Sequence, residues 1–370
     1  MSDFYKFSTE QKSEIIRQTV NRTGLYPQII EKDLWVTTIL QLIFSFPFAD
    51  KLVFKGGTSL SKVWNVIERF SEDIDMTIDR ELFDLQGDLT VKQIKKLRKQ
   101  SSLFVKDTFC LELQKTFEKY DLQHIFTVEP QPNGEGDKTY PEPRKIFVRY
   151  KSLFDDRTYL KSEIVLEIGA RALFEPTAKR EIKSIISENL NIDTNIENNP
   201  INTAVPAKTF IEKAFLLHEI FTGNGRMRAN RKSRHLYDLE KMMNNDFAIT
   251  AISDNVLWDT IRHHRERFTH ISSMDYSQDI RPNICLIPPA QVIDDWREDY
   301  EIMQNTMIYG NSLTFNELID KIKQLEERIR QTITRNSSLS QLCVFVGIYV
   351  IRRGTKKTPQ INISPVLKKY

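Results

Sequence analysis

The stretch FKGGTSLSKVWNVIERFSEDIDM, residues 54–76, decides the fold because it joins two different local structures around one tight turn. Its first part is β-prone and ends in the paired glycines Gly56 and Gly57, after which Thr58 and Ser59 are candidate helix caps. The pattern predicts a strand, a turn and then a helix. One face of that helix would carry the apolar residues Leu60, Val63, Trp64 and Ile67.

The end of the same stretch predicts a second strand with an acidic face. Asp73 and Asp75 alternate with apolar residues, and alternate residues of a strand point to the same side. Their Cα atoms would lie about 6.5–7 Å apart, so both carboxylates can reach a divalent-metal site, and hard oxygen ligands favour Mg²⁺. In nucleotidyl transfer, two ions roughly 3.5–4 Å apart activate the attacking oxygen and stabilise the leaving pyrophosphate. An exposed sheet face without chemistry is the alternative for Asp-x-Asp alone.

The glycine pair is suited to a phosphate-binding turn. Glycine lets the backbone approach a ligand closely, and the N-terminus of the following helix offers unpaired N–H groups to an anion such as a triphosphate. A plain strand-to-helix turn is the alternative for a lone GG followed by Thr or Ser. The turn and the acidic pair are therefore informative mainly because they occur together.

A third carboxylate usually completes a two-metal site, and the β-like segment EIVLEIGAR offers two candidates. Glu163 and Glu167 share one face of this segment, while apolar residues alternate with them on the other. We favour Glu167 as the third metal ligand, with Glu163 as the alternative.

Composition places the protein among soluble globular chains with room for two domains. The 370 residues carry 53 basic and 50 acidic side chains, a net charge of +3, and 40% hydrophobic residues with a mean hydropathy of −0.42. The first residues lack a secretory pattern and no apolar run is long enough for a membrane span, so we expect a cytoplasmic protein without membrane contact. Three scattered cysteines support neither a disulfide framework nor a zinc site.

Five motifs together resemble the AbiEii/AbiGii toxin family of nucleotidyltransferases, over most of residues 25–330. The closest match is GGTSLSKVW followed by RFSEDIDM. The others are EKDLWV at 31–36, LEIGAR at 166–171, IEKAFLLHE at 211–219 and SRHLYDLEKM at 233–242. Their joint occurrence is far more specific than any single motif.

The resemblance implies an α+β fold with a DNA polymerase β-like nucleotidyltransferase core, a mixed sheet with helices, followed by a mainly helical C-terminal region. A polar stretch between Ser187 and Asn202 marks the boundary. We therefore expect a core with N-terminal helices over residues 1–190, a helical domain over 203–331, and a tail over 332–370 whose role we cannot assign.

The resemblance also assigns roles to individual residues. It implies metal binding by Asp73 and Asp75. It implies binding of the nucleotide phosphates by the lysine of IEKAF, Lys213. Further nucleotide contacts would come from Gly56, Gly57, Thr58, Ser59, Arg69 and Ser71. Arg69 could instead be a structural ion-pair partner.

The later motif of the family, often Arg-Asp-x-x-Asp, departs from its usual pattern here. Its first aspartate position is His235, which puts an acidic role there in doubt and which we interpret as structural. Asp238 remains a catalytic candidate that positions the substrate or the lysine, and Arg234 a candidate phosphate contact.

A basic cluster precedes this motif in a chain that is otherwise almost neutral. Concentrated positive charge near an active site is typical of phosphate steering, although a solvated loop is an equal alternative. The candidate RNA-binding residues are Arg226, Arg228, Arg231, Lys232 and Arg234.

The function expected from these observations is transfer of a nucleoside monophosphate from an NTP to an acceptor, with two Mg²⁺ ions bound and pyrophosphate released. The resemblance implies the 3′ end of tRNA as acceptor, and a toxin–antitoxin or phage-defence setting with a separately encoded antitoxin. Two alternatives stay open: the same chemistry on a small molecule or a protein side chain, and a catalytically silent NTP- or RNA-binding protein.

Overall fold

The computed structural model describes residues 2–71, 73–154 and 161–332. Within these ranges, the β-strands form a single seven-stranded mixed sheet in the order β3-β4-β5-β2-β1-β7-β6. The pairs β2–β5 and β1–β7 are parallel, and the other neighbours are antiparallel. The strands are β1 (Leu52–Lys55), β2 (Asp73–Ile78), β3 (Phe126–Pro130), β4 (Arg144–Tyr150), β5 (Glu163–Gly169), β6 (Thr177–Arg180) and β7 (Ile201–Ala204).

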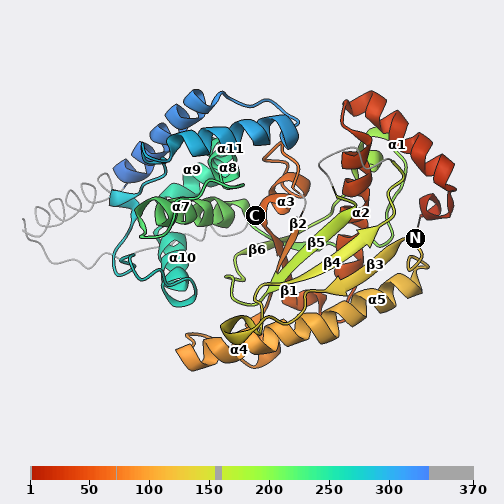
Figure 1. The fold of residues 1–370 in the computed structure, drawn as a ribbon, viewed down its shortest axis with the longest axis horizontal. Coiled ribbons are helices and arrows are strands. Elements are labelled where there is room, and N and C mark those ends of the chain that lie inside the picture. The colour runs from red at the N-terminus through yellow and green to blue at the C-terminus, as the bar shows by residue number, and fades with distance from the viewer. Residues whose placement is uncertain (1, 72, 155–160, 333–370) are drawn as a thin grey trace, which may run out of the picture.

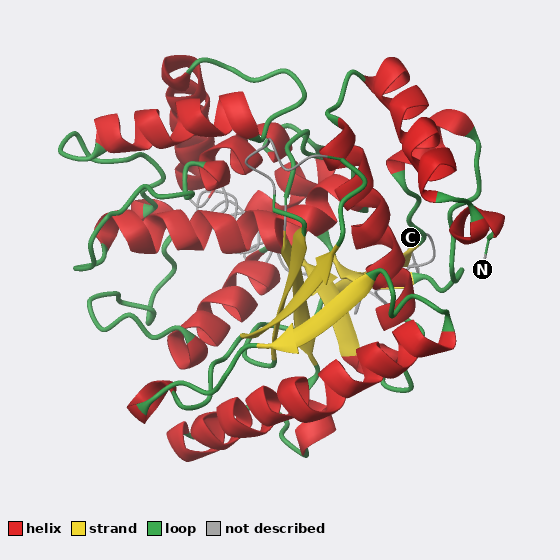
Figure 2. Cartoon of the chain, turned by 45° about the vertical axis from the view of Figure 1, so that its right-hand side comes forward, coloured by secondary structure: helices red, strands yellow, loops and turns green. Residues whose placement is uncertain are grey.

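The helices of the first half pack around this sheet (Figures 1 and 2). They are α1 (Thr9–Thr23), α2 (Pro27–Ile43), α3 (Gly56–Lys62), α4 (Val91–Phe104), α5 (Cys110–Lys119) and α6 (Ile185–Leu190). A π-helical turn over Val105–Phe109 joins α4 to α5, so the two run on as one long element along the sheet in Figure 1. Helix α2 enters through Pro27, and its residues 29–43 are all buried, including the charged side chains of Glu31, Lys32 and Asp33.

The second half is mainly helical and gathers on the other side of the molecule in Figure 1. It consists of α7 (Pro206–Thr222), α8 (Arg234–Met242), α9 (Asp246–Ser253), α10 (Asn255–Phe268), α11 (Ile293–Thr306) and a last helix over residues 315–332. The last helix follows the predicted apolar spacing, because Leu318, Ile322, Leu325 and Ile329 are all fully buried. None of the described helices combines the length and apolar character that a membrane crossing requires.

The apolar side chains form two separate hydrophobic clusters. One is centred on the sheet and the helices of the first half, and the other on α7 and the helices that follow it. Leu60 and Ile67, from the segment between β1 and β2, pack into the second cluster. The expected α+β architecture, with a mixed sheet followed by a mainly helical region, is confirmed. The domain boundaries at 190, 203 and 331 stay predictions, and almost all of the tail lies outside the described residues.

The sequence interpretation was wrong about three local features. Helix α3 ends at Lys62 and does not continue to Ile67, because Asn65 adopts a left-handed backbone conformation with φ of 51°. Strands β6 and β7 were missed because each has four residues and neither shows a clear apolar alternation.

Candidate active site

Sheet register places the predicted acidic pair beside the glycine turn. Asp75 on β2 lies opposite Lys55 on β1, the residue immediately before the turn. On its other side, Asp75 is in register with Glu167 on the parallel strand β5. The turn, the acidic pair and the favoured third carboxylate therefore meet at one place on three adjacent strands.

The two glycines are required by close packing. Gly56 has a φ of 81°, and a Cβ atom there would overlap the Oδ2 atom of Asp75. At Gly57, a Cβ atom would lie 2.5 Å from Nη2 of Arg69 and 3.0 Å from Oγ of Ser71. The turn thus lies directly against the acidic strand and the residues that precede it.

Replacing Gly56 by Ala should reduce activity more than stability. The added methyl group must displace the Asp75 carboxylate, while the positive φ alone costs about 1 kcal/mol. Gly87 is a matched control, since it also has a positive φ of 62° but open space around the Cβ position. We expect Gly87→Ala to unfold at a similar denaturant concentration as Gly56→Ala but to keep wild-type transfer rates. Equal rates in both variants would contradict the proposed contact with Asp75.

The hydroxyl groups after the glycines hold the turn in place. Thr58 Oγ1 donates a hydrogen bond to the backbone carbonyl of Asp73, and Ser59 Oγ donates to that of Gly56 at 2.9 Å. Both side chains are buried. Their hydroxyl protons are therefore used inside the protein, which leaves the role of Thr58 and Ser59 in nucleotide binding a prediction.

Each candidate for the third carboxylate has its own cationic partner. Lys145 Nζ on β4 lies 2.6 Å from Glu167 Oε1, and hydrogen bonding to Glu167 together with the charges of Asp73 and Asp75 raises the pKa of Lys145. Glu163 lies four residues before Glu167, at the start of β5, where Arg149 Nε is 2.7 Å from its Oε2. The register places Glu167, rather than Glu163, beside Asp75.

These positions give opposite expectations for two otherwise identical substitutions. Glu167→Gln should lower transfer activity at least about tenfold, because it removes a charge beside Asp75. Glu163→Gln should leave the rate within about twofold. Steady-state rates of the two variants check this, and loss of activity in Glu163→Gln alone would show that the favoured ligand is wrong.

The sequence resemblance implies a divalent cation, and the residues present have suitable donor chemistry. Carboxylate oxygens are hard ligands, and because Gly56 has no side chain, the Asp75 carboxylate can lie directly against the turn. The single positive charge of Lys145 offsets only part of the charge of the three carboxylates, which a divalent cation would offset further. In this arrangement no three His, Cys, Asp or Glu side chains among the described residues converge closely enough to hold a metal ion. Asp73, Asp75 and Glu167 are the residues that would hold it after side-chain rotation.

Lys213 and Asp238 form a buried ionic network with Arg69. Lys213 Nζ on α7 lies 2.8 Å from Asp238 Oδ2 on α8, and Arg69 binds both carboxylate oxygens at 2.7 and 2.9 Å. Arg69 and Asp238 are essentially inaccessible to solvent. Arg69 thus forms the structural ion pair that was one of its two predicted roles, and its partner is Asp238. Asp238 also contacts Lys213 and holds its ammonium group in place. A catalytic role for Asp238 itself stays a prediction.

His235 completes this network from the same helix as Asp238. Lys213 Nζ lies 3.3 Å from His235 Nδ1, and an ammonium group can only donate, so the imidazole accepts. Desolvation and the positive charge of Lys213 hold the pKa of His235 well below its usual value. Burial likewise lowers the pKa of Lys213, although Asp238 opposes this shift. The contact between His235 and Lys213 is consistent with the interpretation of His235 as a structural residue.

The segment between α3 and β2 is bound to the far end of the chain. Phe70 donates its N–H to the carbonyl of Met307 at 2.7 Å, and Tyr309 donates to the carbonyl of Glu68 at 3.1 Å. Arg69 forms an isolated antiparallel bridge with Ile308. Residues that precede the acidic pair are therefore held by the helical half of the protein.

The turn and the lysine open into one cleft of about 590 Å³. It is lined on the sheet side by Lys55, Gly56, Glu142 and Arg171, and on the helical side by Lys213 and His235. This is the space in which a nucleotide would meet both halves of the protein.

The predicted RNA-binding cluster lies in the loop between α7 and α8 and at the start of α8. Arg226, Arg228 and Arg231 are exposed, whereas Lys232 and Arg234 are partly buried. Burial lowers the pKa of Arg234, with Asp238 and Asp75 opposing the shift, so this arginine lies within electrostatic range of the acidic strand. Of the five, Arg234 is thus the one that the structure brings to the candidate site.

Sequence reasoning missed three residues that shape the site. Lys145 and Glu142 had no motif around them, and only the sheet register reveals that Lys145 lies beside Glu167. Glu142 is buried and accepts hydrogen bonds from the N–H groups of Ala170 and Arg171. Asp33, in the motif EKDLWV, pairs with Lys62 of α3 at 2.5 Å, which gives this motif a structural function behind the turn.

Comparisons with known proteins identify the family of this chain. The family model described as nucleotidyl transferase AbiEii toxin, type IV TA system, matches residues 39–324, well over half of the chain. Comparison with curated protein sequences finds no match. Among solved structures, the chain is similar to MenT4, a nucleotidyltransferase toxin from Mycobacterium tuberculosis, with 16% identity and a TM-score of 0.41 over 88% of this chain and 99% of that one. The family match confirms the resemblance seen in the motifs, and this chain belongs to the AbiEii nucleotidyl transferase toxin family of type IV toxin–antitoxin systems.

Proposed function

We propose that this protein transfers a nucleoside monophosphate from an NTP to the 3′ end of a tRNA, with pyrophosphate as the leaving group. The observation that supports this most is the shared cleft: Gly56, which packs on Asp75, and Lys213 both line it. A phosphate-binding lysine that faces a glycine turn packed on an acidic, metal-binding strand is the arrangement that nucleotidyl transfer needs.

Each candidate residue in and behind the cleft has a distinct task in this proposal. Asp73 and Asp75 bind the cation, and Glu167 joins them when it is released from Lys145. Bound Mg²⁺ supplies Lewis-acid stabilisation of the reacting phosphate oxygens. Lys213 neutralises phosphate charge, Asp238 holds Lys213 in place, and the glycine turn with Ser71 accommodates the triphosphate.

The acceptor and the biological setting follow from charge and from the family. A polyanionic acceptor fits the exposed arginines of the loop before α8, and a tRNA end offers the attacking hydroxyl. As a type IV toxin, the protein would be restrained by a separately encoded antitoxin, in the cytoplasm, in a toxin–antitoxin or phage-defence pair.

The test is to incubate the purified protein with Mg²⁺, total bacterial tRNA and each α-labelled NTP in turn, next to an Asp75→Ala control. We expect label on the RNA with one or two of the NTPs, and none with the control. Label on protein or on a small molecule instead would replace the tRNA acceptor by another one. Absence of any transfer, with nucleotide binding retained in calorimetry, would identify a silent binder.

A further inference from the structure

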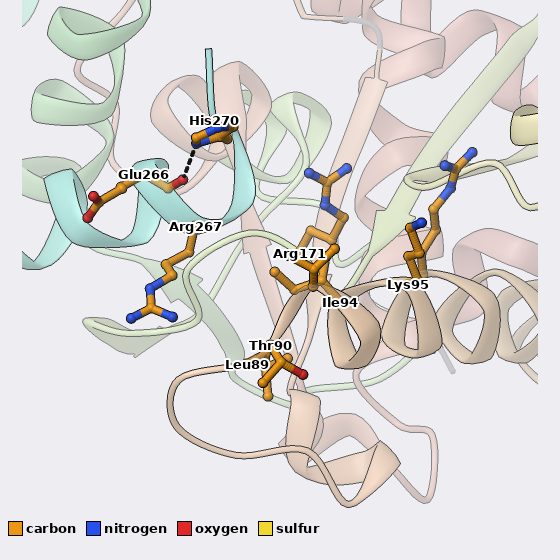
Figure 3. A pocket seen from close by; sticks show the side chains of 10 residues that line it. Leu89, Thr90, Ile94, Lys95, Arg171, Glu266, Arg267 and His270 are labelled. Atoms are coloured by element: carbon orange, nitrogen blue, oxygen red, sulfur yellow. Dashed lines mark hydrogen bonds between the residues drawn. The ribbon is translucent and has the colours of Figure 1, made fainter. Parts of the chain in front are cut away.

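A second cavity lies between α4 and the end of α10, and of the residues that line it only Arg171 also lines the active-site cleft. It has a volume of about 680 Å³. In Figure 3, α4 carries Ile94 and Lys95 on one side, the last turn of α10 carries Glu266 and Arg267 on the other, and Arg171 stands between them. Leu89, Val91 and Ile94 give the cavity an apolar floor.

Four cationic side chains surround this floor, and only one carboxylate, Glu266, lines the cavity with them. The four are Lys95, Arg98, Arg171 and Arg267. Apolar surface bordered by long basic side chains is suited to nucleotides, which combine an apolar base with an anionic phosphate.

Two of these four charges, those of Lys95 and Arg267, are only weakly neutralised by the described residues. Lys95 is exposed and has no hydrogen-bond or ion-pair partner within the part of the chain that the structure describes. Arg267 Nη2 lies 3.3 Å from Asp88, and both of these side chains are well exposed, so their attraction is weak.

Arg171 connects this cavity to the active-site cleft. Its side chain lines both spaces. Nη2 donates to the carbonyl of Phe268, the last residue of α10, while Nε is buried without a hydrogen-bond partner and lies 3.7 Å from Glu142. A chain of phosphates that passes Arg171 would therefore run from the cavity into the cleft that holds Gly56 and Lys213.

We propose that this cavity binds the acceptor strand upstream of its reacting end, with bases on the apolar floor and phosphates against Lys95, Arg98 and Arg267. The proposal rests on the proposed function for the identity of the strand, a single-stranded RNA segment. It adds RNA contacts on α4 and α10 to those proposed for the arginine loop before α8. A free nucleotide or a polyphosphate also carries anionic phosphates that these basic side chains could bind. Comparing a long RNA probe with a short polyphosphate distinguishes an RNA strand from such a small anion.

The test measures binding of a 5′-labelled single-stranded RNA of 12 nucleotides to the full-length protein by fluorescence anisotropy at several salt concentrations. The variant is Lys95→Ala with Arg267→Ala. The control is Lys96→Ala with Lys115→Ala, which removes the same charge from two exposed lysines on α4 and α5 that do not line the cavity. Thermal unfolding of both variants checks that the fold is kept.

We expect the cavity variant to bind the RNA about 25-fold more weakly at ~0.1 M salt, since each lost phosphate contact forfeits release of ~0.7 counterion. The slope of log Kd against log salt should fall by about 1.4. The control should bind like the wild type. Equal weakening in both variants, or none in the cavity variant, overturns the proposal.

Two further measurements separate this inference from its premise. Inorganic tripolyphosphate should bind the cavity variant as well as the wild type, and an equal loss for this small anion would overturn the strand proposal. In transfer assays, the variant should raise the KM for RNA and leave the KM for NTP unchanged. If no RNA is labelled at all but RNA binding still depends on Lys95 and Arg267, the proposed reaction fails while the binding site stands.

Discussion

Replacing Asp75 by Asn should abolish transfer while leaving the protein folded. The substitution keeps the shape of the side chain but removes the negative charge at the point where β1, β2 and β5 meet. Groups that stabilise charge in a transition state typically contribute 10²–10³ in rate, and loss of a metal ligand should cost at least about 10³-fold. Single-turnover rates with saturating Mg²⁺ and NTP measure the effect.

A control separates loss of chemistry from general damage. Asp50→Asn removes the same charge from an exposed position and should retain the wild-type rate. Far-ultraviolet circular dichroism should be the same for both variants. A rate within tenfold of the wild type in Asp75→Asn would exclude Asp75 as a metal ligand and with it the proposed mechanism.

Replacing Asp238 by Ala should destabilise the protein more than almost any other single change. The carboxylate is fully buried between Arg69 and Lys213, so its removal leaves two buried positive charges without a counter-charge. Breaking a buried ion pair in this way costs about 3–5 kcal/mol, a large part of the usual total of 5–15 kcal/mol. Urea unfolding should show a correspondingly lower midpoint.

The same carboxylate predicts how stability responds to acid. Burial alone would raise the pKa of Asp238, but the charges of Arg69 and Lys213 outweigh it and hold the pKa below its usual range. Because this pKa is lower in the folded than in the unfolded protein, the ionised carboxylate stabilises the fold at pH values above its unfolded-state pKa near 3.8. This stabilisation is lost as the pH falls through the folded-state pKa. The stability deficit of Asp238→Ala should therefore persist at neutral pH and shrink in strong acid.

An exposed ion pair provides the comparison for this prediction. Asp294 lies 3.8 Å from Arg297 on the surface of α11 and is 91% exposed. Asp294→Ala should shift the free energy of unfolding by no more than about 0.5 kcal/mol. If Asp238→Ala is as mild as this, the buried network contributes nothing to folding and its role is confined to Lys213.

Local sequence patterns predicted the centre of the fold because its elements are defined by near neighbours. The turn at Gly56 and the strand at Asp73 depend on backbone freedom and on alternation, both of which are visible in a short stretch. Lys145 could not be found this way. Its place beside Glu167 depends on the antiparallel register of β4 with β5, which no local pattern records.

The same distinction explains which site residues stayed uncertain. Arg69 fits a phosphate-binding role and an ion-pair role equally well in sequence, since its partner Asp238 is 169 residues away. The helix after the turn was predicted too long because its sequence does not show that Asn65 is left-handed. Asparagine tolerates a positive φ but also occurs within helices, so its presence alone does not predict a helix end. The apolar residues up to Ile67 are not spaced by a continuous helix. Leu60 and Ile67 are buried because they pack into the second hydrophobic cluster.

The bridge between residues 68–70 and 307–310 has a consequence for how the gene could be divided. A fragment that ends before α7 would carry the turn and both aspartates, yet its segment before β2 would lack the backbone partners at Met307 and Ile308. A second fragment would carry Lys213 without the arginine that shares Asp238 with it. Each fragment would therefore be inactive alone, and activity would return only when the two fragments reassemble. Fused to two other proteins, such fragments would report whether those proteins come close together.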